Sequence, residues 1–164
     1  MSTTATDQEF LSRAIRLATA NVLNNGGPFG ATVVTSDGQA FDGVNRVTAD
    51  NDPTAHAEVT AIRTACRELG TFDLTGAVLY TSCEPCPMCL ASALWARIGR
   101  VVYAADRHDA ASAGFDDAVF YEYFQNPDRG SLMAVAKLEL DGSPSPAPLE
   151  PFITWNALED RTDY

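Results

Sequence analysis

The stretches TAHAE at residues 54–58 and SCEPCPMC at residues 82–89 decide how this chain folds. Each opens a segment whose apolar residues have helical spacing, over 54–69 in the first case and 86–96 in the second. Proline is favoured in the first turn of a helix, and the second stretch holds two prolines near the point where that turn begins. We therefore expect both stretches at helix N-termini, each directly after a loop or a strand.

Outward from these stretches, the chain alternates between strand and helix patterns. Apolar residues recur at helical spacing over 7–25, and an Asp-Gly turn at 37–38 predicts a hairpin. Five segments have the composition of strands: 29–35, 40–44, 77–81, 101–105 and 135–140. Alternating strands and helices predict a layered α/β domain, and the hairpin makes its five-stranded sheet a mixed one.

The C-terminal part of the chain has a different organisation. Residues 143–151 contain four prolines, which predict an extended linker between a domain over 1–142 and a tail over 152–164. Residues 152–158 are expected to form one short helix. This tail carries enough apolar surface to need a docking site, and its larger apolar residues are Phe152, Ile153, Trp155 and Leu158.

Composition favours a small, neutral substrate. The chain has 164 residues and a net charge of −11, from 11 basic and 22 acidic residues. This charge argues against a nucleic-acid partner, because nucleic acids are bound through Lys and Arg. No apolar run reaches the 18 or so residues of a membrane span, so no membrane partner is expected. No export signal is evident at the N-terminus either, so we expect a cytoplasmic protein.

Three side chains from the two stretches have the character of a catalytic metal site. In the absence of an export signal, metal binding explains the clustered cysteines better than disulfides do. Cys86 and Cys89 lie three apart at a helix start, where they point the same way and where the helix dipole favours thiolates. With His56 they would hold zinc and leave its fourth position for water. Glu58 follows the histidine by two residues and could move protons to and from that water without being a ligand.

Cys83 leaves a different kind of site open. If its thiol were a fourth ligand, the metal site would be closed and structural, with no room for water. Cys83 falls at the expected strand end, however, before the helix that orients the other two thiols. Cys66 is expected to be a small buried residue of the preceding helix, and His108 a surface residue.

The combination of His-x-Glu with Pro-Cys-x-x-Cys is the signature of zinc deaminases. The chain resembles the cytidine deaminase-like superfamily at GPFG (27–30), Asn45, NDPTAHAE (51–58) and SCEPCPMC (82–89). Within that superfamily it is most similar to the bacterial guanine deaminases, through DAASAGFDD at 109–117 and the final Tyr164. The resemblance implies a three-layer cytidine deaminase-like fold and one zinc ion per chain.

The resemblance also implies roles for residues around the metal. Asn45 and the backbone N–H of Ala57 would hydrogen-bond the base, and Phe29 and Trp95 would form walls of a flat pocket. Asp117 would accept hydrogen bonds from the base edge and assist the departure of the amine. From the residues alone, Phe29 and Trp95 could equally be core residues, and Asp117 a carboxylate at a helix N-terminus.

The activity implied is hydrolytic deamination of an amino nucleobase, most simply guanine to xanthine and ammonia, with Glu58 moving the protons. The resemblance further implies a homodimer in which the C-terminal tail is exchanged between subunits and Tyr164 lies near the base.

Three alternatives stay open at this point. A deaminase of cytosine, cytidine or an amino-triazine would share both motifs. A tRNA adenosine deaminase would share them too, although the net charge of −11 opposes a polyanionic substrate. A non-catalytic binding module stabilised by zinc would need a fourth ligand and would leave Glu58 without a role.

Overall fold

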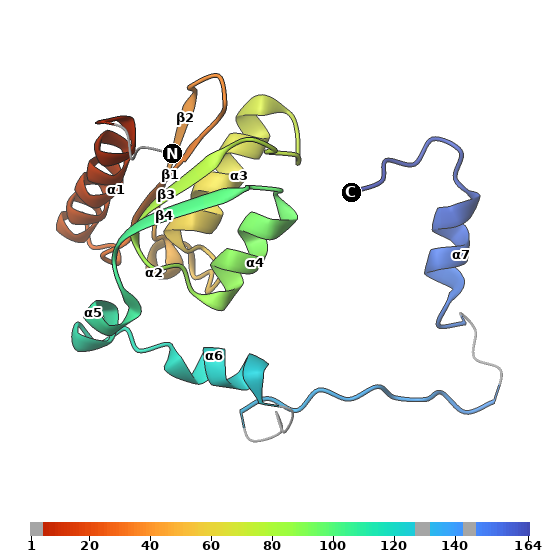
Figure 1. Cartoon of the computed structure of the whole chain (residues 1–164). Coiled ribbons are helices and arrows are strands. Elements are labelled where there is room, and N and C mark those ends of the chain that lie inside the picture. The colour runs from red at the N-terminus through yellow and green to blue at the C-terminus, as the bar shows by residue number, and fades with distance from the viewer. Residues whose placement is uncertain (1–4, 127–131, 143–146) are drawn as a thin grey trace. The chain divides into compact units, whose positions relative to one another are not determined.

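The computed structural model describes residues 5–126, 132–142 and 147–164. It divides into two compact units, Met1–Gln125 and Asn126–Tyr164, and each is considered by itself (Figure 1). In the first unit the strands are β1 (Gly30–Val34), β2 (Ala40–Val44), β3 (Val78–Cys83) and β4 (Arg100–Ala105). Its helices are α1 (Ala5–Leu23), α2 (Val47–Asp50), α3 (Ala57–Leu69), α4 (Pro87–Trp95), α5 (Arg107–Ser112) and α6 (Ala118–Gln125).

The strands form one mixed sheet in the order β2-β1-β3-β4. β1 is antiparallel to both of its neighbours, whereas β3 and β4 are parallel. The expected mixed α/β sheet is therefore confirmed. The expected fifth strand at 135–140 is wrong, because this segment has no strand conformation and belongs to the second unit. Apolar alternation supplies one face of a strand, but a strand also needs a hydrogen-bonding neighbour.

Helices cover both faces of the sheet and make three layers, with α1 on one face and α3 and α4 on the other (Figure 1). Two glycines of the β1–β2 hairpin allow the backbones of α1 and α3 to approach the sheet unusually closely. A Cβ on Gly30 would lie 2.5 Å from the backbone oxygen of Ala14 in α1. A Cβ on Gly43 would lie 2.3 Å from the backbone oxygen of Ala57 in α3. The backbones of the outer helices therefore rest directly on the sheet at these two points.

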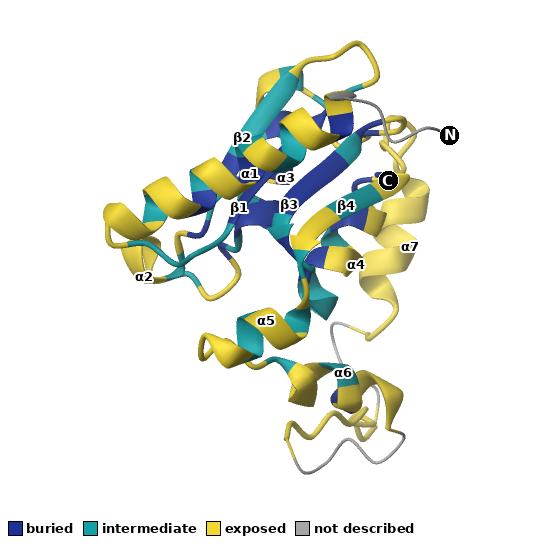
Figure 2. Cartoon of the chain, turned by 60° about the vertical axis from the view of Figure 1, so that its left-hand side comes forward, coloured by how far each residue is buried: buried dark blue, intermediate teal, exposed yellow. Residues whose placement is uncertain are grey.

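The core lies between the sheet and the layer of α3 and α4. Figure 2 shows that burial is concentrated in the central strands β1 and β3. Many of the core side chains are alanines, which lets these helices approach the sheet closely. The buried cluster comprises Ala31, Val33, Ala57, Ala61, Ile62, Ala65, Leu74, Ala77, Leu79, Ala93, Ala96 and Ile98.

The opposite face of the sheet is more polar. The buried carboxylate of Asp7 in α1 accepts a hydrogen bond of 2.6 Å from the Tyr80 hydroxyl. It also forms an ion pair of 2.6 Å with Arg100 at the start of β4. These contacts join α1 to the two parallel strands.

The second unit contains helix α7 (Glu150–Ala157), which confirms the short helix expected at 152–158. Phe152, Ile153 and Leu158 are all more than half exposed. Part of the predicted linker, residues 143–146, lies outside the described residues. Among the helices that the structure describes, none combines the length and apolar character needed to cross a membrane.

The contact at Gly43 generates a prediction. Gly43→Ala forces the added methyl group against backbone atoms of α3, which cannot rotate away as a side chain can. Overpacking of this kind costs about 1–3 kcal/mol, so urea unfolding should show that loss. Gly99→Ala is the matched control, since its added Cβ meets nothing within 4 Å. Equal stability of the two variants would show that α3 does not depend on this contact.

Candidate metal centre and active site

The three predicted ligands come from the first turns of two helices. His56 is the N-cap residue of α3 and Cys86 the N-cap residue of α4, both with extended backbone conformation. Cys89 lies three residues into the second helix, on the same side as Cys86. Neither N-cap residue makes a side-chain hydrogen bond to its own helix, so the imidazole and the thiol are available for another partner.

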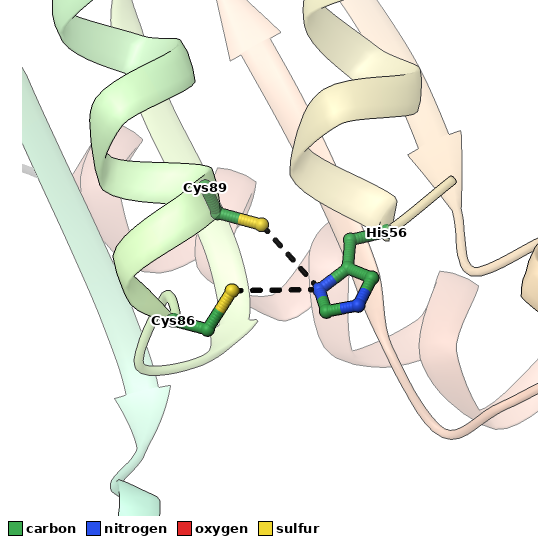
Figure 3. A group of neighbouring side chains, drawn as sticks. All are labelled: His56, Cys86 and Cys89. Carbon is green, nitrogen blue, oxygen red and sulfur yellow. Dashed lines mark hydrogen bonds between the residues drawn. The ribbon is translucent and has the colours of Figure 1, made fainter. Parts of the chain in front are cut away.

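The ligand atoms of these side chains converge on one point (Figure 3). Nδ1 of His56 lies 3.6 Å from Sγ of Cys86 and 3.5 Å from Sγ of Cys89, and all three ligand atoms lie within 4.8 Å of one another. In a tetrahedral site with Zn–S about 2.3 Å and Zn–N about 2.0–2.1 Å, nitrogen and sulfur are separated by about 3.6 Å. The observed separations therefore fit zinc with no rearrangement of the side chains.

Electrostatics favour the ligating form of Cys86. The Cys89 thiol and the His56 ring hydrogen-bond to its sulfur, and together they lower the pKa of Cys86 to about 4. The same hydrogen bond raises the pKa of His56, since a thiolate beside the ring favours imidazolium. A zinc ion would take the place of the protons shared by this group.

Glu58 lies in the first turn of α3 and is only 6% exposed. Burial raises the pKa of this carboxyl, and the charge of Cys86 raises it further. A carboxyl group whose pKa is brought toward neutrality can both accept and return a proton under physiological conditions. Its position beside the three ligands gives it access to whatever occupies the open side of the metal.

Cys83 lies apart from the ligand group. It is the last residue of β3, and its thiol donates to the backbone oxygen of Asp106 at 3.6 Å. Burial raises the pKa of Cys83 to about 11, which keeps it a neutral thiol. In the part of the chain that the structure describes, only His56, Cys86 and Cys89 form a possible metal site. Three protein ligands leave an open position, as in catalytic zinc sites.

Two other expectations from the sequence concern residues outside this group. Cys66 packs against the core as expected of a small apolar residue, but it is half-buried and not fully buried. His108 is exposed near the start of α5, which confirms the expected surface position.

Asn45 and Phe29 lie next to each other, at the end of β2 and just before β1. The N–H of Asn45 donates to the backbone oxygen of Phe29 at 3.1 Å, and Asn45 is 9% exposed. The side-chain amide of Asn21 in α1 holds the two segments together by donating to the backbone oxygens of Asn45 (2.9 Å) and Gly27 (2.8 Å). Ala57 is the first residue of α3, so its N–H has no acceptor within the helix.

Asp117 comes directly before α6 and is half-buried. Burial raises its pKa, with a further contribution from the charge of Cys86, so the carboxyl lies within electrostatic reach of the metal ligands. Asp117 also contributes to raising the pKa of His56.

Two predicted pocket residues come from other segments. Trp95 is the last residue of α4 and is 71% exposed, about 9 Å along the helix axis from Cys89. Tyr164 belongs to the second unit, where its ring packs edge-on against Trp155. The roles of Trp95 and Tyr164 at the base stay predictions.

The structure adds three residues that the sequence did not single out. Glu84, Arg107 and Tyr121 form a connected group that includes part of the loop at 84–86, the metal-binding loop, which leads to Cys86. They come from three elements, and no local motif relates them. Only the position of Glu84, directly before Pro85 and Cys86, offered a signal in the sequence.

The separate places of Cys83 and Cys86 give a test by metal analysis. Cys86→Ala removes one of three ligands and should lower the zinc content far below one per chain. Cys83→Ala removes a thiol that donates to the backbone oxygen of Asp106 and is not one of the three ligands, so it should keep the zinc. Equal zinc loss in both variants would contradict the open, three-ligand site.

Comparison with known proteins agrees with this geometry. The family model for the cytidine and deoxycytidylate deaminase zinc-binding region matches residues 4–105, which include all three ligands and Glu58. The chain is 45% identical to the guanine deaminase of Bacillus subtilis (strain 168) over 96% of this chain and 98% of that protein. An X-ray structure of Bacillus subtilis guanine deaminase matches with a TM-score of 0.86 over the same shares of the two chains.

Two other solved structures match a smaller part of the chain. One is a complex with 2,6-diaminopurine, with a TM-score of 0.64 and 34% identity over 69% of this chain and 64% of that chain. The other is a tRNA:A34 deaminase, with a TM-score of 0.62 and 36% identity over 76% of this chain and 92% of that chain. The family match extends over more than half of the residues and coincides with a ligand group suited to zinc. The chain therefore belongs to the cytidine and deoxycytidylate deaminase family of zinc-binding proteins.

Proposed function

We propose that this chain is a zinc-dependent hydrolytic deaminase that converts guanine and water to xanthine and ammonia. The observation that carries the proposal is the placement of a buried carboxyl, Glu58, beside three ligands that leave one metal position open. A structural zinc site carries out no proton transfer, so it would not need a buried carboxyl beside the metal. The choice of guanine is supported by the near full-length similarity to a guanine deaminase and by the match to a structure holding a diaminopurine.

Glu58 has the central chemical role. When bound, zinc supplies Lewis acidity and lowers the pKa of a coordinated water to about 7. Glu58 accepts a proton from the attacking water and delivers it to a ring nitrogen of the base. The C2 carbon of guanine gains the oxygen, and Glu58 then assists protonation of the amino group, which leaves as ammonia. Burial keeps the carboxyl away from bulk water, which strengthens these transfers.

The groups that we assign to the base come from neighbouring elements. The Asn45 side chain and the free N–H of Ala57 provide hydrogen bonds, and Phe29 provides one wall. Asp117 accepts hydrogen bonds from the donor-rich edge of guanine and assists departure of the amine. Trp95 at the end of α4 is assigned to the other side of the pocket.

Other substrates are the main alternatives. Cytosine, cytidine and amino-triazines would use the same metal and the same carboxyl, and only the groups that contact the base discriminate among them. A tRNA substrate is supported by the match to a tRNA:A34 deaminase but opposed by the net charge of −11. A non-catalytic zinc module fits less well, because Cys83 does not complete the ligand set.

An ammonia-release assay tests the activity and its substrate together. Guanine should be the best substrate in a panel with guanosine, cytosine, cytidine, adenine, triazine amines and folded tRNA. Glu58→Gln keeps the shape of the side chain but cannot accept the proton, so turnover should fall by about 10²–10⁴-fold with zinc retained. Glu68→Gln, the same change at an exposed position of α3, is the control.

Two results of the ammonia-release assay would contradict parts of this proposal. Near-normal turnover by Glu58→Gln would overturn the mechanism. A clear preference for cytosine, cytidine or a triazine would replace guanine as the substrate and leave the zinc chemistry in place.

We also propose a homodimer exchanged through the C-terminal tail, with residues 143–151 as the linker and 152–164 as the exchanged segment. Large apolar side chains are exposed in both units, which indicates surfaces that need cover. Examples are Leu94 and Trp95 of α4, Phe120 and Phe124 of α6, Phe152 and Ile153 of α7, and Leu158 directly after α7. Tyr164 would then close the base pocket of the partner subunit. A cytoplasmic location also stays a prediction.

Deleting residues 160–164 tests the role of the tail. Loss of the aromatic closure should lower kcat/KM for guanine at unchanged zinc content, because water then enters the pocket. Sedimentation of the full chain at micromolar concentration should give a dimer. Unchanged kinetics would show that the tail only packs, and a monomer would exclude the exchange.

A further inference from the structure

The group Glu84–Arg107–Tyr121 connects the metal-binding loop to α6. The guanidinium of Arg107 pairs with the Glu84 carboxylate at 2.5 Å from Nη2 and 3.1 Å from Nε. The backbone N–H of Arg107 donates to the same carboxylate at 3.1 Å. The Glu84 carboxylate therefore accepts hydrogen bonds from three N–H groups of Arg107, and its side chain is only 16% exposed. The start of α5 is fixed to the residue that lies two positions before Cys86.

Tyr121 extends this group into α6. Its hydroxyl donates a hydrogen bond of 2.9 Å to the backbone oxygen of Pro85, the residue directly before Cys86. The Arg107 guanidinium lies over its ring, 3.9 Å from the centroid, in the geometry of a cation–π contact. Burial raises the pKa of Tyr121 to about 12, so the hydroxyl keeps its proton and remains a donor.

Asp117 stands one helical turn before Tyr121. Asp117 directly precedes α6, and its backbone oxygen accepts a hydrogen bond of 2.9 Å from the N–H of Phe120, so it is fixed to the first turn of the helix that carries Tyr121. A second contact fixes the segment before the helix, where the ring of Phe115 packs edge-on against Phe29 at 5.1 Å. Asp117 is therefore held between two contacts, one reaching the metal loop and one reaching a predicted pocket wall.

We propose that Tyr121 and Arg107 are positioning residues for the deamination, because they hold the segment that carries Asp117 at a fixed place relative to the loop that leads to the metal ligand Cys86. This inference rests on the role assigned to Asp117 under the proposed function. Tyr121 acts through the Pro85 carbonyl, and Arg107 acts through the Tyr121 ring and the Glu84 carboxylate. Burial and the charge of Cys86 raise the pKa of Asp117, and the positive charge of Arg107 offsets part of that rise.

The test is a double-mutant cycle on the holoenzyme with guanine as substrate. Tyr121→Phe removes only the hydroxyl and should lower kcat about tenfold or more, since misplacement of a reacting group by about 1 Å can cost about 10²-fold. KM should change by less than about threefold and zinc should stay at one per chain. Arg107→Lys keeps the charge but loses the planar fork and the stacking, so it should show the same pattern. Tyr103→Phe, at an exposed position of β4, is the matched control.

The Asp117→Ala background separates the positioning role from a structural one. If Tyr121 acts through Asp117, adding Tyr121→Phe to Asp117→Ala should change kcat by less than about twofold. Equal losses in both backgrounds would overturn the inference, and so would loss of zinc or of folding in Arg107→Lys and Tyr121→Phe alike. These results leave the proposed function intact provided that the wild type deaminates guanine. A wild type without guanine turnover would instead remove the proposed function and this inference with it.

Discussion

The meeting of two helix N-termini is the constraint on which the rest of the molecule depends. The first turns of α3 and α4 must approach until a ring nitrogen and two sulfurs lie within 4.8 Å of one another. Because metal–ligand distances vary by only about 0.2 Å, three ligands on two short segments allow little variation in the relative position of the two helix starts. The sheet, the hairpin and the outer helices can all be understood as means of fixing that approach.

The sheet meets this constraint largely with backbone contacts. Gly43 lets β2 touch the main chain of α3, and β3 leads directly through the loop at Glu84 into α4. Small core residues such as Ala61 and Ala93 fill the remaining space. Contacts of this kind hold the two helices more rigidly than long side chains would, because few of them can change rotamer. Glu58 benefits as well, since the same close packing buries its carboxyl.

The parts of this arrangement differed in how far the sequence could predict them. His56, Cys86 and Cys89 were predictable because each lies in a local motif whose helix start fixes its direction. The prediction of a strand at 135–140 was wrong, because it rested on the alternation of apolar residues within one segment. A strand also needs a neighbouring strand to which its backbone can hydrogen-bond. The hydrogen bond from Tyr121 to Pro85 joins residues 36 positions apart. No spacing rule relates them, so this hydrogen bond became evident only from the structure. The same is true of the hydrogen bond from the Asn21 side chain to the backbone oxygen of Asn45.

The absence of side-chain caps at His56 and Cys86 has a consequence for the evolution of this fold. Ser, Thr, Asp or Asn at a helix N-cap is worth about 0.5–2 kcal/mol relative to a residue that cannot cap. The chain forgoes that stabilisation at two helices, and it does so at the two positions where the metal is bound. Good capping residues at both positions would stabilise the two helices in the metal-free chain, but they would remove two of the three ligands. The histidine and the cysteine at these positions therefore exchange local helix stability for metal binding, a trade-off common where a protein carries out chemistry.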